Sequence, residues 1–258
     1  MTKIALKLIT PPALEPISLA EAKAHMRLND TTAEDALITA LITAAREYCE
    51  GFQNRAYLEQ TFELWLDDWP YRDCIAIPRP PLQSVTSIKY YGTDNAEYTM
   101  TAADYFVDTK NEPGRVSLAY SKTWPTTTLR PANGALVTFT AGYASYAGTV
   151  NTSGTAVTWV SGDKFGTGWT AGKAIIINSV VYMVASVTSD AALTLTATAG
   201  TQSAAVYSTN DVPQIIKQAI LLLIGDMHEN RENSSNAQFY EAPFAVKALL
   251  WQDRLVPI

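Results

Sequence analysis

The chain has 258 residues, of which 47% are hydrophobic and 17% are charged, and its formal net charge is −6. This composition excludes a disordered chain, because there is enough apolar surface for one large core or two modest ones. The negative net charge and the lack of a long basic cluster argue against a protein that binds nucleic acid tightly, since phosphate binding needs grouped Lys and Arg.

The first residues do not predict a signal peptide, because Lys3, Lys7 and several prolines interrupt the segment MTKIALKLITPPALEP. The two cysteines, Cys49 and Cys74, are too few for a disulfide framework or a zinc site. We therefore expect reduced thiols in a protein that is made in the cytosol.

Two helices are expected near the N-terminus. Ser18 and Glu21 have the spacing of a capping box, which predicts a short helix to about Leu28. The following run, AEDALITALITAAREYCEGF, places apolar residues on one helical stripe and predicts a long amphipathic helix that ends near Gly51.

From Glu59 the apolar period changes from helical to two, which is typical of strands. Phe62, Leu64 and Leu66 are predicted to face the interior. Further strands are expected at 74–77, 85–91, 104–108, 115–119 and 135–141. The turn Asn111–Gly114 is predicted to join two of them in a hairpin. This part of the chain is predicted to be a mostly antiparallel sheet.

Residues 148–208 differ in composition, because they are rich in Thr, Ala, Ser, Gly and Val and have only four charged residues. Short strands are expected at 156–160, 173–178, 180–187 and 193–198, with Asn178 and Ser179 as a tight turn. We interpret this segment as a small all-β module inserted into a connector domain formed by 1–147 and 209–258. The fold class is therefore α+β, with a helical core, an antiparallel β portion and the inserted module.

The segment Asp211–Glu232 predicts a central helix, with Pro213 at its start and Asp211 capping the first turn. The candidate core of this helix is Ile216, Ile220, Leu223 and Met227. A polar stretch, 230–238, then precedes a final helix from Pro243 to Leu255. That helix either packs on its own core or docks on a partner.

Catalytic and cofactor motifs are absent from the sequence. His228 and Glu229 begin like a zinc-protease motif, but Glu232 stands where the second histidine is needed. His25 is a lone histidine, and Asp67 and Asp68 point to opposite faces of a strand, so shared acid–base chemistry is not expected. We expect no enzyme, no metal, no cofactor and no membrane association, and a hydrolase using these residues is a remote alternative.

The aromatic residues Trp159, Trp169, Tyr182 and Tyr207 of the inserted module allow two interpretations. They form either the core of a small barrel or a stacking platform for glycans or single-stranded nucleic acid. A ligand- or glycan-binding protein acting through this module is therefore the alternative function.

A series of segments resembles the head-tail connector (adaptor, or head-completion) proteins of long-tailed bacteriophages and prophages. The segments are LITPPALEPISLAEAKAHMRL, AAREYCEGFQNRAY, TFELWLDDWP, IPRPPLQSVTSIKYY, PGRVSLA with a following WP, VTFTAGY, VPQIIKQAILLLIGDMHENRE and PFAVKALLWQDRLV. They occur in the expected order and cover most of the chain outside 148–208. The inserted module departs from the family pattern, so its role is not transferred.

The resemblance implies a structural subunit at the head–tail interface of a virion, made in the cytoplasm of the bacterial host. It implies a homo-oligomeric ring, a dodecamer, that docks on the portal protein, channels double-stranded DNA without sequence-specific binding, and supports a tail-completion or stopper protein. The candidate portal-docking residues lie in the final helix: Phe244, Leu249, Leu250, Trp251 and Leu255.

Overall fold

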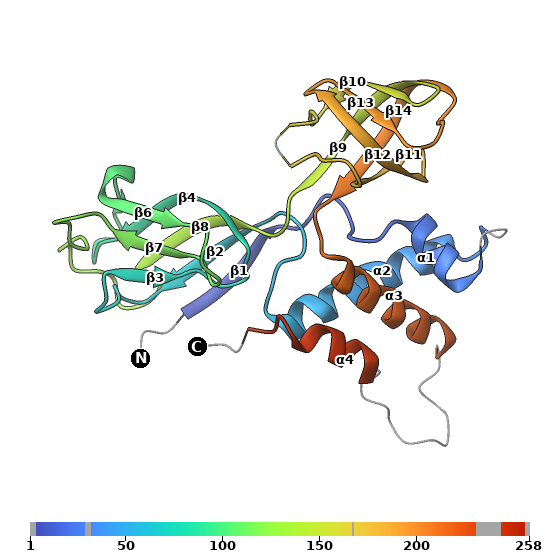
Figure 1. Cartoon of the computed structure of the whole chain (residues 1–258). Coiled ribbons are helices and arrows are strands. Elements are labelled where there is room, and N and C mark those ends of the chain that lie inside the picture. The colour runs from blue at the N-terminus through green and yellow to red at the C-terminus, as the bar shows by residue number, and fades with distance from the viewer. Residues whose placement is uncertain (1–3, 29–31, 167, 231–243, 256–258) are drawn as a thin grey trace, which may run out of the picture. The chain divides into compact units, whose positions relative to one another are not determined.

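The structure is a computed structural model that describes residues 4–28, 32–166, 168–230 and 244–255. The predicted α+β class is confirmed, with antiparallel sheets that include a small barrel (Figure 1). The chain divides into two compact units. The described residues of 1–15, 46–143 and 244–258 form the first unit, and those of 16–45 and 144–243 form the second.

A five-stranded antiparallel sheet is the centre of the first unit, in the order β1-β2-β8-β4-β5. Its strands are β1 (Ile4–Thr10), β2 (Gln60–Leu66), β8 (Ala135–Ala141), β4 (Leu82–Tyr91) and β5 (Glu97–Thr99). The predicted alternation is confirmed, because Phe62, Leu64 and Leu66 are buried and pair with β8. The strand β1 was not predicted from the sequence, and it forms an edge of this sheet.

A second sheet of three strands completes this unit, in the order β3-β7-β6. It contains β3 (Cys74–Ala76), β7 (Arg115–Leu118) and β6 (Tyr105–Asp108), which follows the short 3-10 helix Ala102–Asp104. The predicted hairpin around 111–114 joins β6 to β7. Ile75 and Val116 are buried against the core of the larger sheet.

The second unit contains a closed six-stranded antiparallel barrel (Figure 1). Its strands are β9 (Ser145–Ser153), β10 (Ala156–Gly162), β11 (Ala174–Ile177), β12 (Val180–Ser189), β13 (Ala192–Leu195) and β14 (Thr201–Asn210). The turn at Asn178 and Ser179 is confirmed, and both residues have positive φ. The strands β9 and β14 were not predicted from the sequence, and their mutual pairing closes the barrel.

Two helices of the second unit pack on each other, α1 (Leu19–Met26) and α3 (Gln214–Glu229). The predicted capping box is present, because the Ser18 hydroxyl accepts the Glu21 amide and the Ser18 amide donates to the Glu21 carboxylate. The predicted cap of α3 by Asp211 is wrong, since Pro213 occupies the cap position without a side-chain bond. Lys173 binds the Asp211 carboxylate instead.

The helix α2 (Asp35–Gln53) contributes residues to both units. The helix continues two residues past the expected end near Gly51, to Gln53, and Asn54 then takes the left-handed conformation, with a φ of 56°. A short polar residue such as Asn tolerates this conformation at a helix end. The final helix, α4 (Phe244–Trp251), ends before the predicted Leu255. Among the described residues, no helix is long and apolar enough to cross a membrane.

Candidate docking surfaces

The C-terminal segment of the first unit is held by hydrogen bonds from the end of α2. The Gln53 side chain donates to the Leu250 carbonyl and the Asn54 side chain to the Leu255 carbonyl, each over 2.7 Å. Arg55 donates to the carbonyl of Asp253 over 2.7 Å. Three consecutive side chains therefore fix the backbone of 250–255, which makes this segment part of the folded unit.

The predicted docking residues of α4 differ in exposure. Leu250 is buried in the unit, whereas Leu249 and Leu255 are half-buried. Trp251 is 64% exposed and contacts Phe52, with 6.3 Å between ring centroids. The side chain of Phe244 lies outside the described residues. The apolar side chain that α4 offers most openly to a partner is therefore Trp251.

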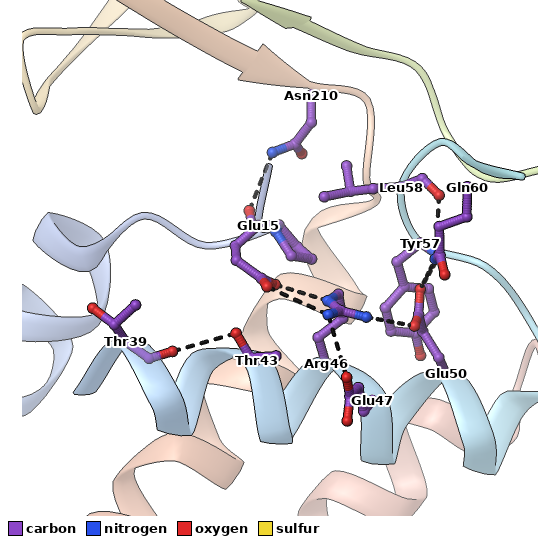
Figure 2. A network of polar contacts seen from close by, with 11 residues as sticks. Glu15, Thr39, Thr43, Arg46, Glu47, Glu50, Tyr57, Leu58, Gln60 and Asn210 are labelled. Carbon is purple, nitrogen blue, oxygen red and sulfur yellow. Dashed lines mark hydrogen bonds and ion pairs between the residues drawn. The ribbon is translucent and has the colours of Figure 1, made fainter. Parts of the chain in front are cut away.

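A buried polar network lies at the C-terminal half of α2 (Figure 2). The carboxylate of Glu50 accepts the Tyr57 amide and the Gln60 side-chain amide, both over 2.7 Å, and the Arg46 guanidinium over 2.9 Å. Arg46 also donates to Glu15 over 2.8 Å. The network links the segment before α1, the helix α2 and the start of β2.

Burial changes the pKa values of the ionisable groups in and beside this network. Desolvation raises the pKa of Glu50 above its ordinary value, although the Tyr57 amide and Arg46 oppose the change. Burial alone would lower the pKa of Arg46, but the hydrogen bond to Glu15 and the charge of Glu50 outweigh it, so this pKa is raised. Burial also raises the pKa of Cys49 to about 12, which favours the inert thiol form.

An apolar depression runs under the edge strand β1, and we call it the β1 trough. Ile4, Leu6 and Leu8 pair with the buried residues of β2, yet they are 61%, 37% and 45% exposed. Two hollows of about 360 Å³ and 280 Å³ lie along them, and both are lined by Leu6 and Arg79. The first hollow is mainly apolar, whereas the second is bounded by charged residues of α2. The trough is therefore an open groove with an apolar and a charged end.

The residues considered for catalysis have structural partners. His228 lies 2.9 Å from a carboxylate oxygen of Glu34, and His25 lies near Gly225 of α3. Asp67 accepts the Asn133 amide and Asp68 accepts the Trp69 amide, so each carboxylate is used locally. In the described ranges, no group of three or more His, Cys, Asp or Glu residues is placed to hold a metal ion. Both cysteines are free thiols.

The barrel aromatics do not form an exposed platform. Trp169 and Tyr207 are buried in the barrel core with Phe165, and Trp159 and Tyr182 pack against it. The Phe165 and Trp169 rings meet edge to face, with 4.9 Å between centroids. This arrangement supports the core interpretation and removes the main support for glycan stacking.

Comparison with known families identifies the first part of the chain. Residues 16–113 match the model of the Phage gp6-like head-tail connector protein family. Over these residues, the chain is similar to this family. Its matched region includes α1, α2 and β2, and with them Arg46, Glu50 and Gln60 of the network in Figure 2. The predicted family resemblance is confirmed, and with it a structural, non-enzymatic protein of the virion head–tail interface.

Solved structures share the fold over almost the whole chain. The neck of an empty GTA particle with C6 symmetry matches with a TM-score of 0.59 and 20% identity, covering 98% of this chain and 97% of that one. The virion of a native gene transfer agent particle matches with a TM-score of 0.58 and 20% identity, covering 98% and 96%. No curated protein matches the sequence. At 98% coverage, the aligned length includes the barrel.

Proposed function

We propose that this connector protein forms a homo-oligomeric ring that docks on the portal, channels the genome and presents a surface for tail completion. The observation that carries the proposal is the match of residues 16–113 to the head-tail connector family. The neck structures with the same fold were obtained with C6 and C12 symmetry, which supports a cyclic assembly of twelve subunits. In this proposal, the net charge of −6 repels the phosphates of a DNA duplex, so the duplex passes through the ring without binding tightly.

Trp251 is the proposed centre of the portal contact, together with the half-buried Leu249 and Leu255. An exposed aromatic side chain on an anchored helix is a typical binding hot spot, because it buries a large area at a small entropic cost. The hydrogen bonds from Gln53, Asn54 and Arg55 hold the backbone around Trp251 before binding. Such pre-organisation reduces the cost of association.

The variant Trp251→Ala tests this contact. We expect the fold to remain, because the side chain is 64% exposed, and we expect portal affinity to fall by tenfold or more. Phe106→Ala is the matched control, since Phe106 is 66% exposed in the same unit but belongs to β6. Equal portal binding by Trp251→Ala and the wild type would contradict the assigned role of α4.

A further inference from the structure

The edge strand β1 has apolar side chains that remain exposed in the described part of the chain. Ile4, Leu6 and Leu8 lie on the same side of the sheet as the core residues of β2. Unlike those residues, they do not belong to the buried hydrophobic cluster of this unit. A row of exposed apolar residues beside an unpaired strand edge is a feature that proteins normally blunt or cover. The β1 trough is therefore suited to receive another segment.

Arg79 gives the trough a specific chemistry. It lines both hollows, and its guanidinium donates one hydrogen bond, to the Glu50 carbonyl, over 2.8 Å. Among the described residues, no ion pair joins Arg79 to a carboxylate. Its φ of 61° is left-handed, a conformation that costs energy for a side chain of this kind. The fitting ligand is an apolar side chain followed by a carboxylate.

The same unit contains a surface of that chemistry, formed by residues 67–73 and 119–124, which we call the tyrosine loops. Tyr71 and Tyr120 are the most exposed aromatic residues described, at 107% and 95%. Asp73 is exposed two residues after Tyr71, and in the described part of the chain its carboxylate has no hydrogen bond. By contrast, the Asp68 carboxylate accepts the Trp69 amide.

The conformation of the tyrosine loops is stabilised by contacts that do not involve the Tyr71 side chain. The Trp69 and Trp124 rings stack with 5.0 Å between centroids and 6° between planes. The Trp124 indole donates to the Arg72 carbonyl over 3.0 Å, and the Leu118 amide donates to the Asp73 carbonyl over 2.8 Å. A rigid loop with an uncovered aromatic residue is pre-organised for binding.

We propose that the β1 trough of one copy receives the tyrosine loops of a second copy, with Tyr71 in the apolar hollow and Asp73 against Arg79. The inference rests on the proposed ring, because a cyclic assembly needs two different complementary surfaces on each chain. The pair supplies them: an apolar groove with an unpaired cation, and an aromatic side chain with a free carboxylate. The charged contact fixes the register of the two copies, and the aromatic contact provides the affinity.

Mixed cysteine variants test the contact directly. Leu6→Cys and Tyr71→Cys are made separately in a Cys74→Ser background, in which the remaining Cys49 is buried. Each variant is oxidised alone and in a mixture, with and without portal. We expect a disulfide-linked dimer only in the mixture. The control pairs Leu6→Cys with Phe106→Cys, for which we expect no cross-link.

Each other outcome has a distinct meaning. A ring detected by light scattering without the mixed cross-link would overturn this inference while leaving the proposed function intact. A cross-link in Leu6→Cys alone would indicate symmetric pairing of β1 strands, which also overturns it. A wild-type protein that stays monomeric with portal would contradict the ring, and the inference would fall with it.

Charge exchange gives a second test. Arg79→Asp and Asp73→Arg should each weaken assembly about tenfold or more, and the two changes together should restore most of it. Arg79→Gly separates binding from folding, because glycine adopts the left-handed conformation readily. We expect this variant to remain folded but to assemble weakly. No recovery in the double exchange would contradict the Arg79–Asp73 contact.

Discussion

The sheet of the first unit and the barrel of the second differ in their strand edges, because the sheet has unpaired edge strands and the barrel has none. The barrel pairs every strand with two neighbours and fills its interior with Phe165, Trp169 and Tyr207. The sheet ends at β1, whose seven residues are all exposed. A closed barrel has no free strand edge and an open sheet does, and our proposal therefore assigns the contact with a second copy to the first unit.

The two regions also treat charge differently. The first unit buries Arg46 and Glu50 in a network that connects segments far apart in the sequence. The barrel segment 148–208 has four charged residues, and one pair, Lys164 and Asp190, lies on the surface with side chains 49% and 60% exposed. Removing charge should therefore have unequal effects at the buried pair Arg46–Glu50 and at the exposed pair Lys164–Asp190.

The largest expected effect is that of Arg46→Ala. Removing one partner of a buried ion pair leaves the buried Glu50 carboxylate without this counter-charge, and such losses cost about 3–5 kcal/mol. We expect the urea midpoint to fall accordingly, as followed by circular dichroism. Glu47→Ala on the same helix is the control, because the Glu47 side chain is 66% exposed. A change below about 1 kcal/mol for Arg46→Ala would show that the network adds little to stability.

A core truncation in the barrel should be almost as costly. Ile177 of β11 is fully buried, and Ile→Ala at such a site typically removes about 2–5 kcal/mol from the free energy of unfolding. Thermal unfolding of Ile177→Ala and of the exposed control Val180→Ala measures the difference. Equal midpoints for the two variants would contradict the placement of Ile177 in the barrel core.

The response to pH should reveal the burial of Glu50. The pKa of Glu50 in the folded state is above its ordinary value of 4.5. Between the ordinary pKa and the folded pKa, the folded state therefore binds more protons than the unfolded state does. The free energy of unfolding of the wild type should therefore fall as pH rises through this window, relative to Glu50→Gln. The slope should be at most about 1.4 kcal/mol per pH unit. The opposite sign would mean that Arg46 and the amide donors dominate over burial.

The smallest effect is expected for Lys164→Ala in the barrel. The pair with Asp190 is exposed at both ends, and pairs of this kind contribute about 0–1 kcal/mol. The same denaturation assay used for Arg46→Ala should detect little change. A loss of several kcal/mol would remove the contrast between the buried network and the barrel surface.

Local features were predictable from the sequence, because their causes lie within a few residues. The capping box at Ser18 and the turn at Asn178 and Ser179 depend on neighbouring residues alone. The alternation of β2 is also local, since a half-buried strand alternates by geometry. The family resemblance, which depends on the order of many segments, is confirmed by the match of residues 16–113.

Features that depend on distant partners were not predictable. The carboxylate of Asp211 had a suitable position to cap α3, but Lys173 binds it across 38 residues of sequence. Arg46 and Glu50 have the spacing of an ordinary surface pair, and only Glu15, Tyr57 and Gln60 make them a buried network. The strand β14 has few large apolar residues, so its place is set by pairing with β9.

Two predictions from the sequence remain open. The division into a connector domain, 1–147 with 209–258, and a module, 148–208, stays a prediction, although the barrel strands span 145–210. The candidate core of α3 includes the buried Ile216, Ile220 and Leu223 and the half-buried Met227.

The central claim is that this protein assembles as a ring at the portal. The most direct test is mass determination by light scattering of the purified protein, alone and then mixed with its portal. We expect a ring-sized species, either in the protein alone or on addition of portal. A strict monomer in both conditions would contradict the account.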